Sequence, residues 1–315
     1  MGAVMRARAV LTAAVMAGLL AACSAHRDSP SAHSQDPSRP EDSPTARGSF
    51  PATPTWSPTP APSESATAHP ASPTSSSTAL PARALWKPKP GLSWQWQLDG
   101  EVKPTVDVPV YDIDGFENSM ADVARLHAAG RKVICYVNVG AWENFRPDKD
   151  DFPRSVLGST NGWAGERWLD IRKLSVLRPI MERRFDMCRA KGFDAVEPDL
   201  VEGYGNDTGF RLTAADQLRY NRMIADIAHE RGLSVGLKND LPQIPHLLAD
   251  FDFAVNEECA QYDECARLTP FVKAGKAVFH VEYEEPPSAF CAESRRLGLS
   301  SMQKKLELGV WRRPC

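Results

Sequence analysis

The stretch Phe193–Asp240, FDAVEPDLVEGYGNDTGFRLTAADQLRYNRMIADIAHERGLSVGLKND, decides the fold of this chain. It begins with a β-rich run over Phe193–Pro198, continues into a helical pattern over Thr213–Arg231, and ends in a second β-rich run over Ser234–Leu237. A strand, a helix and a second strand in this order predict one unit whose two strands run parallel.

Both ends of this helix carry a boundary signal. Thr213 is followed three residues later by Asp216, which resembles a capping box, although Asp is a poorer partner than Glu at that position. Gly232 stands between the helix and the second strand, where a glycine suits a left-handed helix cap.

The alternation of strand and helix continues on both sides of this unit. Six further strands are predicted at Ser93–Leu98, Pro109–Ile113, Lys132–Val137, Arg167–Ile171, Phe251–Val255 and Ala277–Glu282. The further helical patterns cover Ser119–Ala129, Ser175–Lys191 and Tyr262–Ala274. Eight strands in this order predict an α/β fold of the (β/α)8 TIM-barrel type rather than a doubly wound open sheet, because no Gly-rich phosphate loop follows the first strand.

The start of the chain has the composition of an export signal. Arg6 and Arg8 precede an apolar run that ends at Ala22, so residues 1–22 are predicted to be a signal peptide. The run ends in Leu20-Ala21-Ala22-Cys23, which resembles a bacterial lipobox and predicts a lipid on Cys23. The alternative is an ordinary cleavage site at which Cys23 is incidental.

Residues 23–85 are dominated by Ser, Pro, Thr and Ala and predict a disordered linker, because such a segment buries too little apolar surface to fold. Residues 86–315 remain as the barrel domain, with a length close to the roughly 250 residues of a typical barrel. We therefore expect a monomer outside the cytoplasm, attached to the membrane through the lipid alone or secreted.

Charge and cysteine content narrow the possible partners. The net charge is −3 and no basic run is interleaved with aromatics, so a nucleic-acid partner is not expected. The six cysteines after Cys23 can pair in 15 ways in an exported protein, and Cys259–Cys265 and Cys291–Cys315 are the local pairings. Cys135 is interpreted as a buried or bridged thiol rather than a nucleophile.

Acidic residues recur where the predicted strands end, which is where a β/α barrel carries its function. Paired carboxylates are what most glycosidic-bond hydrolysis requires, one as the acid and the other as nucleophile or base. Glu197 and Asp199 are two residues apart and point to one side of their strand, with Asp199 at the rim and Glu197 one layer deeper. The alternative for Glu197 is a structural ion pair with Lys238.

The other side chains at these ends are predicted to contact a sugar, the aromatic rings by stacking and the polar groups by bonding hydroxyls. Trp94 and Trp96 could equally be plain core. The predicted substrate-binding residues are Trp96, Tyr111, Asp112, Tyr136, Glu143, Asp170, Glu197, Lys238, Asn239 and Tyr283.

Two other chemistries have little support. Gly232–Gly236 matches G-x-S-x-G, but here a helix leads into a strand, whereas a nucleophile elbow requires a strand that leads into a helix. The chain has no H-E-x-x-H motif, and three of its histidines lie in the linker, so no metal or cofactor is expected.

From about Leu92 to Cys315 the chain resembles glycoside hydrolase family 114, the endo-α-1,4-polygalactosaminidases. Many blocks in one order carry the resemblance, among them WQWQL, ICYVNVGAWENFRPD, GWAGERWLDIR, FDAVEPD, GLSVGLKND, FAVNEECAQYDEC and KAVFHVEY.

The resemblance implies a β/α barrel that cleaves α-1,4-linked galactosamine-containing polysaccharide. It places the essential aspartate on Asp199 and the essential glutamate on Glu257, and a retaining reaction would make Asp199 the nucleophile. Leu200 and Glu202 depart from the residues usual in the family, which puts the fine substrate preference in doubt. Two alternatives stay open, a tethered carbohydrate-binding protein without catalysis and a glycosidase that acts on another α-linked glycan.

Overall fold

A computed structural model describes residues 85–315 of the chain. The predicted signal peptide, the lipidation site at Cys23 and all but the last residue of the predicted linker lie outside the described residues. Within the described part, no helix is both long enough and apolar enough to cross a membrane.

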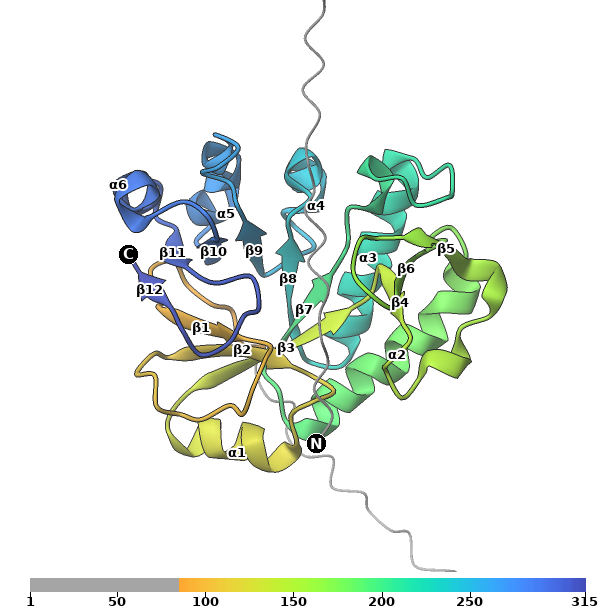
Figure 1. The fold of residues 1–315 in the computed structure, drawn as a ribbon, viewed down its shortest axis with the longest axis horizontal. Helices are drawn as coiled ribbons and strands as arrows, with labels where there is room; N and C mark the ends of the chain where they lie inside the picture. Colours follow the sequence, from red (N-terminus) through yellow and green to blue (C-terminus); the bar gives the residue numbers. More distant parts are fainter. Residues whose placement is uncertain (1–84) are drawn as a thin grey trace, which may run out of the picture. The chain divides into compact units, whose positions relative to one another are not determined.

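Eight parallel strands form one curled sheet in the order β1-β2-β3-β7-β8-β9-β10-β11, and β12 adds to β11 in the antiparallel sense (Figure 1). The strands are β1 (Trp94–Gln97), β2 (Val110–Asp114), β3 (Lys132–Asn138), β7 (Ala195–Asp199), β8 (Ser234–Lys238), β9 (Phe253–Glu257), β10 (Val278–Glu282), β11 (Ser300–Gln303) and β12 (Arg313–Pro314).

The last parallel strand is connected back to the first by side-chain and loop contacts. Trp94 Nε1 in β1 donates to the carbonyl oxygen of Ser300 in β11 at 2.9 Å. The amide of Leu98, just after β1, donates to the carbonyl oxygen of Leu308 in the segment after β11, also at 2.9 Å. These contacts complete the circuit of a (β/α)8-type barrel, which confirms the predicted fold class.

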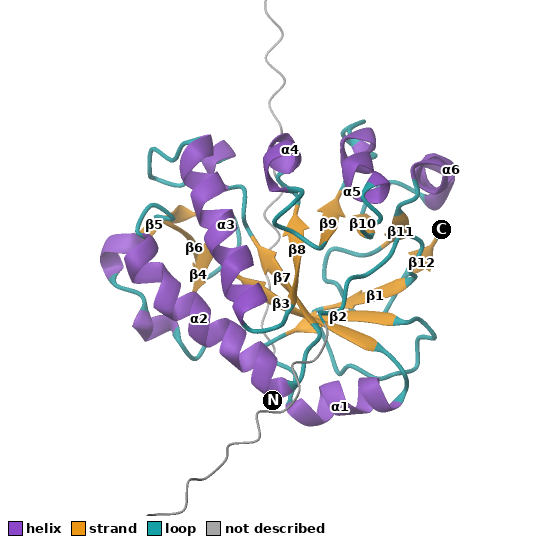
Figure 2. Cartoon of the chain, turned by 180° about the vertical axis from the view of Figure 1, so that it is seen from behind, coloured by secondary structure: helices purple, strands orange, loops and turns teal. Residues whose placement is uncertain are grey.

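Helices cover the outside of the curled sheet, from α1 through α6 (Figure 2). They are α1 (Met120–Ala128), α2 (Leu174–Lys191), α3 (Ala214–Glu230), α4 (Ile244–Leu247), α5 (Thr269–Lys273) and α6 (Pro287–Leu297). Short 3-10 turns occur at η1 (Lys149–Asp151), η2 (Arg154–Val156), η3 (Gly203–Gly205), η4 (Leu241–Gln243) and η5 (Cys265–Leu268). The predicted capping box is confirmed, because Thr213 Oγ1 accepts from the amide of Asp216 at 3.1 Å.

One predicted barrel strand is wrong and another was missed. Arg167–Ile171 falls largely on β6 (Glu166–Leu169), which pairs antiparallel with β4 (Ala141–Glu143) and β5 (Leu157–Thr160) in a small separate sheet between β3 and α2. The missing barrel strand is β11. The alternation of apolar residues indicates a strand but does not say which sheet the strand joins.

The interior of the barrel is filled with aromatic rings. Trp94 and Trp96 in β1 stack with their ring centroids 5.9 Å apart, and Trp94 lies 5.0 Å from Phe279 in β10. Both tryptophans are only 1% exposed, so each buries a large apolar surface, on the order of 200 Å2. This packed interior forms the floor on which the strand-end residues stand.

Three disulfides are formed among residues 85–315. Cys259–Cys265 and Cys291–Cys315 confirm the two local pairings, and Cys135 in β3 bonds Cys188 in α2. Cys135 is therefore a bridged cysteine, as its buried position in a strand suggested.

Candidate active site

A buried ammonium group connects the ends of three neighbouring strands. Lys238, the last residue of β8, is only 3% exposed at its side chain. Its Nζ lies 2.8 Å from Asp199 Oδ1 at the end of β7, 3.2 Å from Glu257 Oε2 at the end of β9, and 3.2 Å from Glu197 Oε1 deeper in β7. Neighbouring parallel strands end at one rim, so the order of the strands alone brings these groups together.

Asp199 and Glu257 form a matched pair above Lys238. The second oxygen of each accepts from a tyrosine: Tyr136 Oη donates to Asp199 Oδ2 at 2.7 Å, and Tyr283 Oη donates to Glu257 Oε1. Their side chains are 16% and 25% exposed, so both can be reached from solvent. The oxygens that face Lys238 are within about 6 Å of each other, the most that contacts of 2.8 and 3.2 Å to one atom allow.

The electrostatic surroundings keep these groups in defined protonation states. Burial opposes ionisation of Asp199, but Lys238 and the hydrogen bond from Tyr136 outweigh it and hold the pKa of Asp199 below its usual value. Burial, together with the neighbouring carboxylates, raises the pKa of Tyr136 and of Tyr283 well above the usual value. Both tyrosines therefore remain hydrogen-bond donors at neutral pH.

The floor below the ammonium group holds a second pair of carboxyl groups. Glu197 and Asp112 are both completely buried. Burial and the adjacent Glu197 raise the pKa of Asp112 well above its usual value, which favours its uncharged form. The ring of Trp96 lies beneath Lys238, with 4.8 Å between its centroid and Nζ. Lys238 thus contacts Glu197 and the Trp96 ring on its buried side.

The backbone turns sharply immediately after each of these three strands. Leu200, Asn239 and Glu258 have φ angles of 59°, 51° and 60°, in the left-handed region that ordinary residues rarely adopt. Such positions cost on the order of 1–3 kcal/mol each and cluster at functional sites. Next to Leu200 only glycine fits, because a Cβ at Gly140 would lie 1.8 Å from the Leu200 carbonyl oxygen.

Asn239 joins Glu257 to a further carboxylate. Its Oδ1 accepts from the Glu257 amide at 3.0 Å, and its Nδ2 lies 3.2 Å from Glu257 Oε2 and 3.5 Å from Glu202 Oε1. Glu202 Oε2 accepts from the amide of Asp240 at 2.9 Å. Burial raises the pKa of Glu202 to about 7, although the Asp240 amide partly offsets this.

Asp240, whose amide bonds Glu202, has a side-chain carboxyl group with a strongly raised pKa. It is 2% exposed, and burial together with Glu202 raises its pKa to about 8, against the opposing hydrogen bonds from Tyr204 and Asn221. A carboxyl group whose pKa is raised in the folded state stabilises the fold below its unfolded pKa of about 4, and this stabilisation is lost as pH rises towards 8.

Replacing Asp240 by Asn, which mimics the protonated form, should remove this loss. Relative to the variant, the wild type should become less stable by on the order of a few kcal/mol between pH 4 and 8. Thermal unfolding of both proteins at a series of pH values measures the difference in stability. Glu202 and Glu143 titrate in both proteins, so the comparison isolates the contribution of Asp240. A constant difference across this range would show that Asp240 is ionised throughout.

The structure brings only part of the predicted site together. Tyr136, Lys238, Asn239 and Tyr283 surround the pair formed by Asp199 and Glu257, and Tyr136, Asn239 and Tyr283 are partly exposed. The other predicted substrate-binding residues are buried and contact protein groups instead; they are Trp96, Tyr111, Asp112, Glu143, Asp170 and Glu197.

Tyr111 and Glu143 show why some of the predicted residues lie away from the carboxylate pair. Tyr111 points out of the barrel, and its hydroxyl donates to the Val106 carbonyl at 2.8 Å, because it alternates along β2 with the inward-facing Asp112. Glu143 lies in β4 of the small sheet, where Arg146 binds it at 2.9 Å; burial, partly offset by Arg146, raises its pKa to about 7. Neither side chain offers a surface to a ligand.

Glu202 is the residue at this site that sequence reasoning had not assigned to it. It follows Asp199 by three positions, beyond the end of β7, so no strand periodicity points it towards the other carboxylates. Two signals were available in the sequence: Glu202 lies close to a candidate catalytic aspartate, and it departs from the residue usual in the family.

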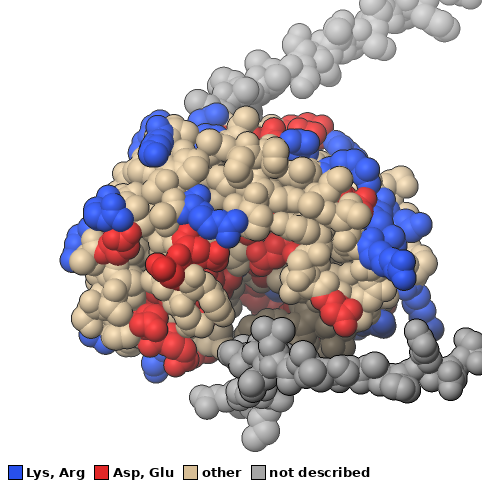
Figure 3. Space-filling view, turned by 90° about the horizontal axis from the view of Figure 1, so that it is seen from above, with Lys and Arg blue, Asp and Glu red and all other residues tan. Residues whose placement is uncertain are grey.

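The surface of the molecule is acidic around a hollow. Asp and Glu side chains gather around a hollow on the face seen in Figure 3, and Lys and Arg lie mostly towards its edge.

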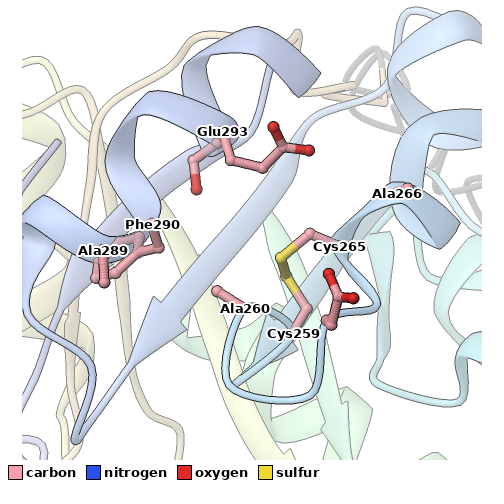
Figure 4. A pocket seen from close by; sticks show the side chains of 9 residues that line it. Cys259, Ala260, Cys265, Ala266, Ala289, Phe290 and Glu293 are labelled. Atoms are coloured by element: carbon pink, nitrogen blue, oxygen red, sulfur yellow. A yellow bond between two sulfur atoms is a disulfide. The ribbon is translucent and has the colours of Figure 1, made fainter.

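A separate cavity of about 170 Å3 lies between α6 and the Cys259–Cys265 disulfide, lined by Phe290 and Glu293 among others (Figure 4). The two sulfur atoms lie near His280 and Glu282, but they are bonded to each other and are not free thiolates for a metal.

Known proteins share the sequence pattern and the fold of this chain. The model of the glycoside-hydrolase family GH114 matches residues 75–315. The solved structure of Aspergillus fumigatus Ega3 in complex with galactosamine is 41% identical, with a TM-score of 0.71, and the match covers 74% of this chain and 98% of that chain. The glycoside hydrolase domain of PelA from Pseudomonas aeruginosa shares the fold at 15% identity and a TM-score of 0.55, over 71% of this chain and 98% of that one. The search of curated proteins found no match.

Proposed function

Because the chain belongs to glycoside hydrolase family 114, we propose that it cleaves α-1,4-linked galactosamine-containing polysaccharide at internal bonds, with Asp199 and Glu257 as its carboxylate pair. The observation that carries the proposal is the shared contact of these two partly exposed carboxylates with Lys238. The similar Ega3 was solved with bound galactosamine, which supports the substrate class.

The spacing of the pair favours a retaining reaction. Retaining enzymes hold their carboxyl groups about 5–5.5 Å apart, whereas inverting enzymes leave about 6.5–9.5 Å for a water molecule. The two facing oxygens are at most about 6 Å apart, which is below the inverting range. The lowered pKa of Asp199 keeps it ionised, as a nucleophile must be.

In the proposed first step, an Asp199 oxygen bonds to the anomeric carbon as the glycosidic C–O bond breaks, and Glu257 gives its proton to the leaving oxygen. In the second step, Glu257 takes a proton from a water molecule, the water oxygen bonds to the anomeric carbon, and the ester to Asp199 breaks. Tyr136 and Tyr283 orient the two carboxylates throughout.

The three disulfides support an oxidising location outside the cytoplasm. With the predicted lipid on Cys23, we propose that the enzyme is held at the outer side of the membrane.

Incubation of the full chain with a purified α-1,4-galactosamine polymer tests the proposal. We expect new reducing ends and a spread of oligosaccharide lengths, with the first products keeping the α configuration by NMR. A panel of other α-linked glycans serves as the comparison. Binding of the polymer without new reducing ends would favour the carbohydrate-binding alternative, and cleavage of another glycan alone would favour a different specificity.

A further inference from the structure

Several acidic groups near the barrel mouth are in contact with a cationic side chain. Asp199, Glu197 and Glu257 share Lys238, Asp114 and Glu143 bind Arg146, and Asp170 binds Arg172. Glu202 is different: within residues 85–315 no Lys, Arg or His lies within ion-pair distance of its carboxylate. Its polar contacts are the Asp240 amide at 2.9 Å and Asn239 Nδ2 at 3.5 Å.

We propose that Glu202 binds the free ammonium group of a substrate sugar next to the cleavage point and so distinguishes free amines from acetylated ones. The inference rests on the proposed function, because it concerns the same substrate. Glu202 is partly exposed, so a cation from solvent can reach it.

The position of Glu202 relative to Glu257 is fixed by one atom. Asn239 Nδ2 lies 3.2 Å from Glu257 Oε2 and 3.5 Å from Glu202 Oε1, so these two oxygens are less than about 7 Å apart. This is on the scale of one sugar ring. A sugar whose glycosidic oxygen contacts Glu257 therefore has ring substituents within reach of Glu202.

The charges that face Glu202 suit a cation. Asp199 and Glu257 repel a further negative charge, and Asp240 and Tyr204 also interact electrostatically with Glu202. Lys238 is the one cation among these electrostatic partners, and it is already in contact with three other carboxylates. An ammonium group would neutralise the charge of Glu202, whereas an acetamide would leave a partly buried carboxylate uncompensated.

Glu258 also lacks an ion-pair partner within the described chain, but it is a weaker candidate. No hydrogen bond fixes its carboxylate among the described residues, whereas that of Glu202 has two partners. Its nearest acidic neighbours are Glu257, Glu282 and Glu284.

The test replaces Glu202 by Gln in the full chain, which removes the charge and keeps an acceptor for the Asp240 amide. Asp207→Asn is the matched control, because Asp207 is exposed in the same loop and has no ion-pair partner among the described residues. On a deacetylated α-1,4-galactosamine polymer, Glu202→Gln should raise KM about 10- to 100-fold with little change in kcat. On a largely N-acetylated polymer, and in the control on either polymer, KM should stay within about twofold of wild type.

The pH dependence gives a second readout. An amino sugar is a weaker base than a lysine side chain, so its ammonium group stays largely charged only between about pH 5 and 6, where Glu202 begins to ionise towards its pKa of about 7. The wild-type KM for the deacetylated polymer should therefore fall as pH rises across this interval, and Glu202→Gln should lose that part of the change. The same slope in both proteins would overturn the proposal.

Two further measurements separate failure of the ammonium site at Glu202 from failure of the proposed function. Glu202→Asp keeps the negative charge but carries it on a shorter side chain, farther from the substrate. Its KM should therefore lie between those of wild type and Glu202→Gln. A KM equal to that of Glu202→Gln would contradict a role for the charge. If no galactosamine polymer is cleaved by any of the proteins, the proposed function fails, and titration with galactosamine then decides. Weaker binding to Glu202→Gln than to wild type would support the ammonium site, and equal binding would overturn it.

Discussion

Replacing Asp199 by Asn should lower kcat on a galactosamine polymer by about 10³-fold or more, because an amide cannot form the covalent ester that the retaining route requires. The fold should survive, since Asn has the same shape and Lys238 keeps its contacts with Glu197 and Glu257. Reducing-end assays together with thermal unfolding measure both effects. Asp226→Asn, exposed on the outer side of α3, is the control for loss of a negative charge.

Glu257→Gln separates the two roles. Loss of the general acid should cost about 10²- to 10⁴-fold on the polymer. On an aryl galactosaminide with a good leaving group, the first step needs no protonation, so Glu257→Gln should recover most of its rate for that step while Asp199→Asn should not. The reverse pattern would exchange the two assignments, and full activity of either variant on the polymer would remove that residue from the mechanism.

Replacing Lys238 by Met should have the largest effect on stability. The ammonium group is 3% exposed and lies within 3.2 Å of three carboxylates, one of which is completely buried. Removing one partner of a buried ion pair leaves uncompensated charge and costs about 3–5 kcal/mol of unfolding free energy. The same change frees the facing oxygens of Asp199 and Glu257, so activity should fall as well.

The stability loss in Lys238→Met should depend on pH with a defined sign. Without the cation, the carboxylates are destabilising when ionised, so the difference from wild type should be largest at neutral and higher pH and shrink as they become protonated in acid. Chemical unfolding at several pH values measures it. Lys103→Met is the control, because Lys103 is 58% exposed in a surface pair with Glu101, where about 0–1 kcal/mol is at stake. A loss as small as that of the control would show that Lys238 does not compensate the three carboxylates.

The strands of the barrel could be predicted where they are apolar and continuous, as in β7, β8 and β9. β11 was missed because SSMQ is short and polar and gives no apolar periodicity, although its position in the sheet buries most of it. The segment that became β6 was assigned to the barrel because its alternating pattern is that of any strand. The count of eight parallel strands was therefore correct, although one of its members was not.

The sequence by itself determined the fold class, the acidic rim and, through the family resemblance, the choice of Asp199 and Glu257. These follow from local periodicity, from the rule that parallel strands end at one edge, and from the order of motifs along the chain. Only the tertiary structure decided which carboxylates are reachable: Glu197 lies at the floor under Lys238, while Asp199 and Glu257 stand above it. It also placed Glu202 beside Glu257. The physical reason is that burial and ion pairing depend on contacts between residues far apart in sequence, such as the 39 residues that separate Asp199 from Lys238, and no local pattern contains them.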